Sequence, residues 1–213
     1  QENIPAIIEA WYPGEEGGTA LAGVLFGDYN PAGRLPVTFV KSLDQLPPFT
    51  DYNMKGRTYR YMEEEPLYPF GYGLSYTTFA YSDLTVSDRE LATTDQKEIQ
   101  VNVAVTNTGK RTGEEVVQLY LSAPGAGVTV PRWELKGFER VALEPGEKKT
   151  VNFSLNRRQL ASIDEEGDCL LVPGLYRIYV GGRQPDDRSR RLAGTGVLTA
   201  EVRMEGEAVK LPY

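Results

Sequence analysis

The side chains that could do acid–base or nucleophilic chemistry in this sequence are carboxylates, lysines and tyrosines, because none of its 213 residues is a histidine. Without an imidazole, the chain cannot form a Ser-His-Asp or Cys-His catalytic centre, a His-ligated metal site or a histidine proton shuttle. Paired carboxylates, such as those of glycosidases, remain within reach. The acidic clusters are therefore the first candidates.

Three acidic clusters stand out, and none has the spacing of a catalytic pair or a metal site. Glu15 and Glu16 are adjacent at the start of a predicted helix, where successive side chains point about 100° apart, so we interpret them as stabilising the helix dipole rather than facing one glycosidic bond. The acidic run 63–65 is interpreted as a solvated loop. The acidic turn 164–168 lacks the pattern of a calcium loop, so we predict no metal and no other cofactor.

The composition predicts a soluble globular protein. The 23 Lys and Arg against 30 Asp and Glu give a net charge of -7, which disfavours nucleic acid as a partner. No apolar run approaches the roughly 20 residues of a membrane-spanning helix, so no membrane partner is expected. The single cysteine, Cys169, excludes a disulfide within the chain. The compartment stays open between cytoplasm, periplasm and secretion.

Residues 1–45 are predicted to be an incomplete α/β unit. The apolar run 6–11 favours a strand, 15–26 favours a helix capped by Gly27, and 34–40 favours a second strand. A mostly apolar strand followed by a helix is half of a βαβ unit, whose strand normally has parallel neighbours. Because this part of the chain offers no strands to complete such a sheet, we expect the rest of that domain on other polypeptide.

Residues 46–76 differ in composition and predict a long irregular connecting segment. It is rich in proline and glycine and carries tyrosine at positions 52, 59, 61, 68, 72 and 76. Disordered segments contain few aromatics, so we expect this one to be held against another surface. Packing of one domain against another is the simplest interpretation.

Residues 77–213 predict a β-sandwich. Seven stretches have the length and alternation of strands and are separated by turn signals: 79–86, 99–106, 116–121, 135–143, 150–155, 176–180 and 197–204. That number and spacing are typical of an immunoglobulin-like or fibronectin type III-like sandwich. The charged residues 186–191 are interpreted as a solvated loop. The predicted fold class is therefore mostly β, with a sandwich preceded by an incomplete α/β segment and a long irregular linker.

Several motifs, taken in order, resemble the C-terminal part of glycoside hydrolase family 3. Those motifs occupy residues 10–18, 22–36, 56–61, 66–77, 105–109, 114–120 and 135–138. The resemblance implies that 1–45 is the end of that family's α/β sandwich domain, that 46–76 is its tyrosine- and proline-rich linker and that 77–213 is its fibronectin type III-like domain.

The resemblance also implies an activity for the complete enzyme. Members of this family hydrolyse β-linked glucosides, xylosides or similar sugars by a retaining double displacement. Their aspartate nucleophile lies in an amino-terminal barrel, and their acid/base glutamate lies ahead of the segment that resembles 10–18. We therefore assign no catalytic residue to this chain and expect it to be a scaffold, inactive alone, whose partners are upstream catalytic domains of the same enzyme, covalent or on another chain. The substrate of the complete enzyme would be a β-linked oligosaccharide or glycoside.

The connecting segment also holds the only candidates that we name for substrate binding. Tyr59, Arg60 and Tyr61 combine aromatic rings with a guanidinium, which suit the faces and hydroxyls of a sugar. The hypothesis is that they lie near a sugar subsite of the complete enzyme.

Two other interpretations remain open. The chain could be a non-catalytic module whose sandwich binds carbohydrate or protein through aromatic side chains such as Tyr120 and Trp133. Alternatively, unpaired strands in 1–45 could expose sheet edges and make the chain a homodimer. No sugar or linkage preference is predicted, because the resemblance implies that the subsite residues lie on upstream sequence.

Overall fold

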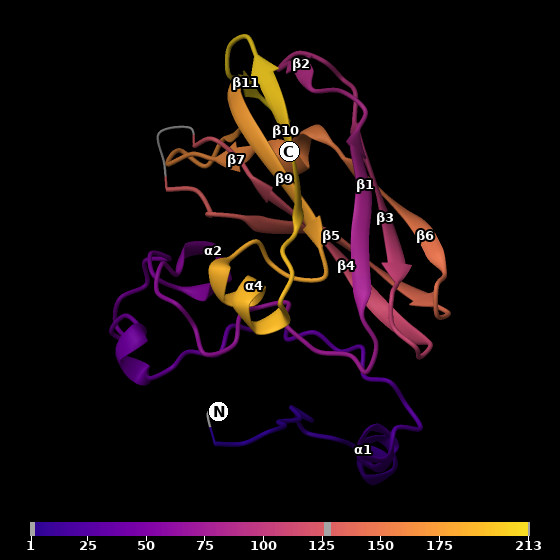
Figure 1. The fold of residues 1–213 in the computed structure, drawn as a ribbon. Coiled ribbons are helices and arrows are strands. Elements are labelled where there is room, and N and C mark those ends of the chain that lie inside the picture. The colour runs from indigo at the N-terminus through magenta and orange to yellow at the C-terminus, as the bar shows by residue number, and fades with distance from the viewer. Residues whose placement is uncertain (1–2, 126–128, 213) are drawn as a thin grey trace.

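The computed structural model describes residues 3–125 and 129–212, and Figure 1 shows their arrangement. A β-sandwich occupies one side of the molecule, and the segment before residue 77 runs along one end of it (Figure 1). The helices are α1 (Gly17–Phe26), the 3-10 helix η1 (Leu43–Gln45), α2 (Thr58–Tyr61), α3 (Arg157–Leu160) and α4 (Asp187–Ala193). The strands are β1 (Phe79–Val86), β2 (Glu90–Ala92), β3 (Ile99–Asn107), β4 (Gly113–Ser122), β5 (Glu134–Leu143), β6 (Lys148–Leu155), β7 (Ser162–Ile163), β8 (Cys169–Leu171), β9 (Gly174–Gly181), β10 (Leu198–Glu205) and β11 (Val209–Lys210).

Two sheets form the sandwich. One has the strand order β1-β3-β6 and the other the order β2-β10-β9-β4-β5, and a small third sheet is formed by β11, β8 and β7. The pairings are antiparallel except for β2, which lies parallel to β10. The predicted mostly-β sandwich is confirmed, and each of the seven predicted strands is present.

The core lies between the two large sheets and follows from the period of two along each strand. In β3, Ile99, Val101, Val103 and Val105 are completely buried, and they face inward-pointing residues of β4, β9 and β10. Because the pleat sends alternate side chains to opposite faces, a shift by one residue would expose this whole set. The apolar alternation therefore fixes the register of the central strands.

The alternation did not identify the short elements. Strands β2, β7, β8 and β11 contain only two or three residues each, too few for a period to show. The prediction of a solvated loop at 186–191 was wrong, because this stretch begins the helix α4. The Asp186 carboxylate accepts a hydrogen bond from the Ser189 backbone N–H at 2.8 Å, and Gly194 closes the helix with a φ of 71°.

The N-terminal segment contains the predicted helix but no strand. Helix α1 ends at Phe26, and Gly27 caps it in the left-handed region with a φ of 81°. The strands predicted at 6–11 and 34–40 are absent. No backbone hydrogen bond links residues 5–10 to another described segment, whereas 35–39 makes a few such bonds to 67–72. Extended backbone without a neighbouring strand cannot form a ladder.

None of the helices in the described parts of the chain is long and apolar enough to cross a membrane.

Apolar side chains are distributed very unevenly between the two parts of the chain. Among the described residues, all but two of the exposed large hydrophobic side chains lie before residue 77, the exceptions being Phe138 and Ile163. In the first part, Phe26, Phe49 and Tyr12 are at least 85% exposed. Exposed apolar area of this kind marks an interaction surface.

A buried asparagine joins the start of the sandwich to two of its turns. The Asn107 amide nitrogen donates to the Arg111 carbonyl at 2.8 Å and to the Leu143 carbonyl at 2.9 Å. Its amide oxygen accepts from the Thr77 hydroxyl at 2.7 Å and from the Gly109 N–H at 3.0 Å. The side chain is completely buried, so each of these groups would otherwise lack a partner.

Replacing Asn107 with alanine should therefore lower the free energy of unfolding by about 3 kcal/mol, because several buried polar groups lose their partner at once. Asn102→Ala on the same strand is the matched control. Asn102 is partly exposed and donates one long hydrogen bond, 3.4 Å to Thr85, so its loss should stay within about 0.5 kcal/mol. Urea unfolding followed by circular dichroism measures both, and equal losses would contradict the role given to Asn107.

Candidate functional site

A buried ion pair connects the N-terminal segment to the sandwich. An Nη of Arg34 lies 3.0 Å from a carboxylate oxygen of Glu115 in β4, and the two side chains are 9% and 4% exposed. The other Glu115 oxygen accepts a hydrogen bond of 3.0 Å from the Tyr81 hydroxyl in β1. One acidic side chain thus binds a residue far away in sequence and also bridges the two large sheets.

The surroundings of Glu115 are tightly closed. Burial raises the pKa of Glu115, although the Arg34 charge acts in the opposite direction, and burial raises the pKa of Tyr81 well above its usual value. Burial also lowers the pKa of Arg183, which lies near the same group. A Cβ atom on Gly182 would lie 2.1 Å from a Glu115 oxygen, so any side chain there would have to displace this carboxylate.

Sequence reasoning missed this pair, although a signal was present. Glu115 shares the inward-facing parity of Val117, Leu119 and Leu121, so a carboxylate stands where the alternation calls for an apolar residue. A buried charge is tolerated only with a partner, so an Arg or Lys from elsewhere in the chain could have been expected.

The connecting segment covers the outer face of β4. The Gln118 amide donates to the Gly71 carbonyl at 3.0 Å, and the Tyr120 hydroxyl donates to the Gln118 amide oxygen at 2.6 Å. Gly71 has a φ of 75°, and a Cβ there would lie 2.3 Å from Gln118. Tyr120 is completely buried, and burial raises its pKa well above the usual value. The expectation of an exposed aromatic contact at Tyr120 was therefore wrong.

Tyr59 belongs to the same interface. Its ring stacks on Phe70 with centroids 4.2 Å apart and meets Tyr120 edge-on at 6.1 Å. Its hydroxyl accepts a hydrogen bond of 3.0 Å from the backbone N–H of Leu135 in β5. These contacts hold α2 against the sandwich.

The three named candidates do not line one cavity. Tyr59 contributes to a cavity of about 350 Å³, whereas Arg60 and Tyr61 line a second cavity of about 400 Å³. Arg60 is paired with Glu134 of β5 at 2.9 Å. A role of these side chains in a sugar subsite stays a prediction.

Charged side chains close the contact between the connecting segment and α4. The Glu65 carboxylate pairs with Lys41 at 2.9 Å, with Arg188 at 3.8 Å and with Arg191. Arg188 also donates to the Leu67 carbonyl at 3.1 Å. Part of the acidic run is thus an interface group rather than a solvated loop, while Glu63 and Glu64 are exposed.

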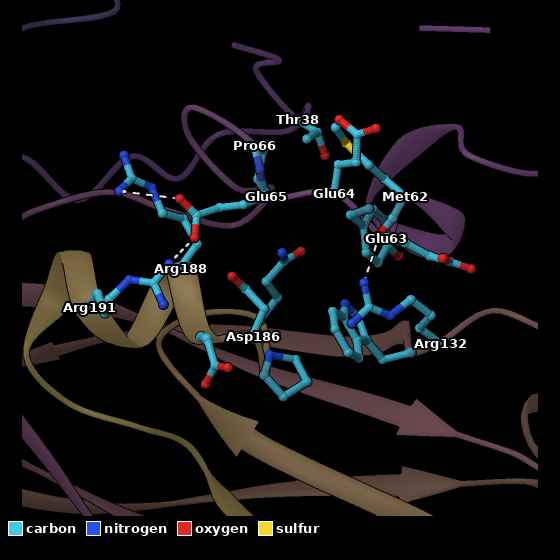
Figure 2. A pocket seen from close by; sticks show the side chains of 15 residues that line it. Thr38, Met62, Glu63, Glu64, Glu65, Pro66, Arg132, Asp186, Arg188 and Arg191 are labelled. Atoms are coloured by element: carbon cyan, nitrogen blue, oxygen red, sulfur yellow. Dashed lines mark hydrogen bonds and ion pairs between the residues drawn. The ribbon is translucent and has the colours of Figure 1, made fainter. Parts of the chain in front are cut away.

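Figure 2 shows the first cavity between these elements. Met62, Glu64 and Pro66 come from the connecting segment above it, and Arg188 and Arg191 come from α4 on the opposite side (Figure 2). Further lining residues are Thr38, Tyr59, Glu63, Glu65, Arg132, Trp133, Gln184, Pro185, Asp186 and Asp187.

The arrangement is suited to holding segments together. The Glu115 and Glu65 carboxylates are engaged by arginines and a lysine in interfaces. Glu15 and Glu16 are exposed beside the start of α1. Within the described ranges, no cluster of carboxylates and the cysteine has the grouping of a metal site.

Comparison with protein families and known proteins shows which domains the chain contains. Residues 1–76 match the model described as the glycosyl hydrolase family 3 C-terminal domain, and residues 115–184 match the fibronectin type III-like domain. The chain is 46% identical to a xylan 1,4-beta-xylosidase of Xylanibacter ruminicola over 91% of its own length, and 43% identical to a periplasmic beta-glucosidase of Salmonella typhimurium over 84%. It spans only 22% and 25% of those two relatives.

Solved structures agree with this placement. A β-glucosidase from Erythrobacter marinus superposes with a TM-score of 0.79 at 39% identity, covering 96% of this chain and 26% of that one. For beta-glucosidase 3B from Thermotoga neapolitana the TM-score is 0.77 at 33% identity, covering 94% and 28%. This chain thus superposes over nearly its whole length on one part of each of these longer proteins. The chain thus carries the C-terminal domain of glycoside hydrolase family 3 in residues 1–76, followed by a fibronectin type III-like domain.

Proposed function

We propose that this chain is the non-catalytic C-terminal part of a retaining β-glycosidase. In the complete enzyme it positions catalytic domains that lie on other polypeptide and hydrolyse β-glucosides, β-xylosides or related sugars. Supporting this proposal, relatives of the chain are named beta-xylosidase and beta-glucosidase, and the chain spans about a quarter of their length.

One observation carries the proposal: the uneven distribution of exposed apolar side chains. The sandwich has a closed core, whereas the segment before residue 77 leaves Trp11, Leu25, Phe26 and Phe49 between 51% and 92% exposed. Burying apolar area is worth roughly 25 cal/mol per Å², so a domain that covered these side chains would be held strongly. The proposed occupant is the rest of the α/β domain to which α1 belongs.

In this proposal the sandwich orients the catalytic domains without contributing a residue to the active site. The Arg34–Glu115 ion pair and the Gly71 contact fix the N-terminal and connecting segments to the sandwich. A domain docked on the N-terminal segment inherits that orientation. A free-standing binding module is less well supported, because Tyr120, one of the two aromatic contacts it would use, is completely buried.

The 213-residue chain alone should not hydrolyse a chromogenic β-glucoside or β-xyloside, since the proposal places both catalytic carboxylates elsewhere. Purified chain is assayed with nitrophenyl β-glucoside and β-xyloside, and the full-length protein is the positive control. Turnover that copurifies with the chain and survives removal of contaminating enzymes would refute the proposal.

Replacing Arg34 with methionine should lower the free energy of unfolding by about 3–5 kcal/mol, because Glu115 is left buried without its partner. Arg177→Met is the matched control. Arg177→Met breaks an exposed ion pair of 3.0 Å with Glu201, and it should lower the free energy of unfolding by no more than about 1 kcal/mol. In the full-length protein, only Arg34→Met should also weaken glycosidase activity, and unchanged kinetics would contradict the positioning role.

The decrease in the free energy of unfolding caused by Arg34→Met should depend on pH. Burial already raises the folded-state pKa of Glu115, and removing the Arg34 charge raises it further. A raised carboxyl pKa contributes stability at low pH that disappears as pH rises through the folded-state value. The difference between wild type and variant should therefore shrink as pH falls from about 8 to about 5. A difference independent of pH, measured by urea unfolding, would show that Glu115 is not the group involved.

A further inference from the structure

The outer face of β5 carries an exposed phenylalanine, Phe138. Its side chain is 65% exposed, and among the described residues after residue 77 only Ile163 is another large hydrophobic side chain with such exposure. We propose that Phe138 is a direct contact of the catalytic domains, so that their docking surface extends from the N-terminal segment onto the sandwich. This inference rests on the proposed function and adds to it a contact that the sandwich itself makes.

The register of β4 and β5 shows which way Phe138 points. Phe138 lies opposite Gln118, whose amide donates to the Gly71 carbonyl of the connecting segment at 3.0 Å. Residues directly opposite each other in an antiparallel pair project from the same face. The preceding residue, Gly137, faces inward, since a Cβ there would lie 3.0 Å from the Phe153 ring. Phe138 therefore points away from the core, on the face that the connecting segment partly covers.

Phe138 adjoins a contact between β5 and the N-terminal segment. Two residues further along the strand, Arg140 projects from the same face and donates to the Tyr29 hydroxyl at 2.6 Å. Tyr29 is exposed and follows α1, whose last two residues, Leu25 and Phe26, are exposed as well. Exposed apolar side chains thus continue from the end of α1 through Tyr29 to Phe138, with the Arg140 side chain between the last two.

One occupant can cover both parts of this surface. The chain spans 22% and 25% of two relatives, so most of a complete enzyme of that length lies on other polypeptide. The proposed function already places that polypeptide against α1. A second copy of this chain seated on Phe138 alone would leave the exposed side chains of α1 in water. One docked domain therefore removes more apolar area from water than such a dimer.

The chemistry around Phe138 suits a protein contact. A phenylalanine buries a large, rigid apolar ring, and aromatic side chains are enriched in the cores of protein interfaces. The neighbouring Arg140 is paired with Glu114, so the charge beside the ring is already neutralised. The facing surface of the catalytic domains should therefore be apolar opposite Phe138 and polar around it.

Hydroxyl-radical footprinting measures the exposure of Phe138 directly. The 213-residue chain and the full-length protein are oxidised under the same conditions, and modified peptides are quantified by mass spectrometry. Phe138 should lose most of its reactivity in the full-length protein, as should Phe26 at the end of α1. Ile163, which is 55% exposed, is the matched control and should react equally in both.

A pair of variants tests what the contact contributes to stability. Phe138→Thr and Ile163→Thr each replace an exposed apolar side chain with a β-branched residue that suits a strand. In the 213-residue chain both should leave the urea midpoint nearly unchanged, because neither side chain is buried there. In the full-length protein only Phe138→Thr should lower the melting temperature, by several degrees, because only Phe138 loses a buried contact. Circular dichroism checks that each variant folds.

The outcomes separate this inference from the proposed function. Protection of Phe26 without protection of Phe138 would overturn the sandwich contact and leave the proposed docking on α1 intact. Protection of neither side chain would overturn both. Protection of Phe138 that grows with concentration in the isolated chain would assign the surface to a second copy instead. Equal melting-temperature shifts for the two full-length variants would also contradict the contact.

Discussion

The whole arrangement depends on one buried charge. Glu115 stands on the core side of β4, where its side chain is only 4% exposed, and it is tolerated because Arg34 and Tyr81 both reach it. That requirement fixes the N-terminal segment onto the sandwich at a single geometry. It also explains the absence of a side chain at Gly182, since any Cβ would occupy the place of the carboxylate. A single acidic residue thus sets both the internal packing of the sandwich and its relation to the rest of the chain.

The sandwich could be predicted from sequence because its strands are long enough to show a period of two. In β3, the buried residues Ile99, Val101, Val103 and Val105 carry that period, as do Tyr176, Ile178 and Val180 in β9. The first 45 residues do not form the two strands that their apolar runs predict. The apolar run at 6–11 has strand composition, but a strand exists only with a hydrogen-bonded neighbour, and the described chain provides none for it. Amino-acid composition indicates a tendency to form a strand, but a strand forms only where a neighbouring strand accepts and donates its backbone hydrogen bonds.

The interfaces were harder to predict, for a related reason. In the sequence alone, the charges of Glu65, Arg188 and Arg191 look solvent-exposed. A local charge pattern does not predict a contact between residues 126 positions apart, such as Glu65 and Arg191. Tyr59 and Tyr120 look like exposed aromatics until the two segments that carry them are placed face to face. The sequence did indicate these interfaces through the alternation of β4. A carboxylate occupies position 115 on its inner face, and large side chains occupy positions 118 and 120 on its outer face. Both pointed to partners outside the sandwich.

The burial of β4 on both faces sets the size of the unit that evolution or an engineer can move between proteins. A sandwich transferred to another protein from residue 77 onward would lack Tyr59 and Gly71, which cover Gln118 and Tyr120. The amide and hydroxyl groups that are buried in this chain would then be exposed to water beside apolar rings. The natural boundary for exchange therefore lies upstream of α2, so the tyrosine-rich stretch travels with the β-domain, even though its composition suggests a mere connector.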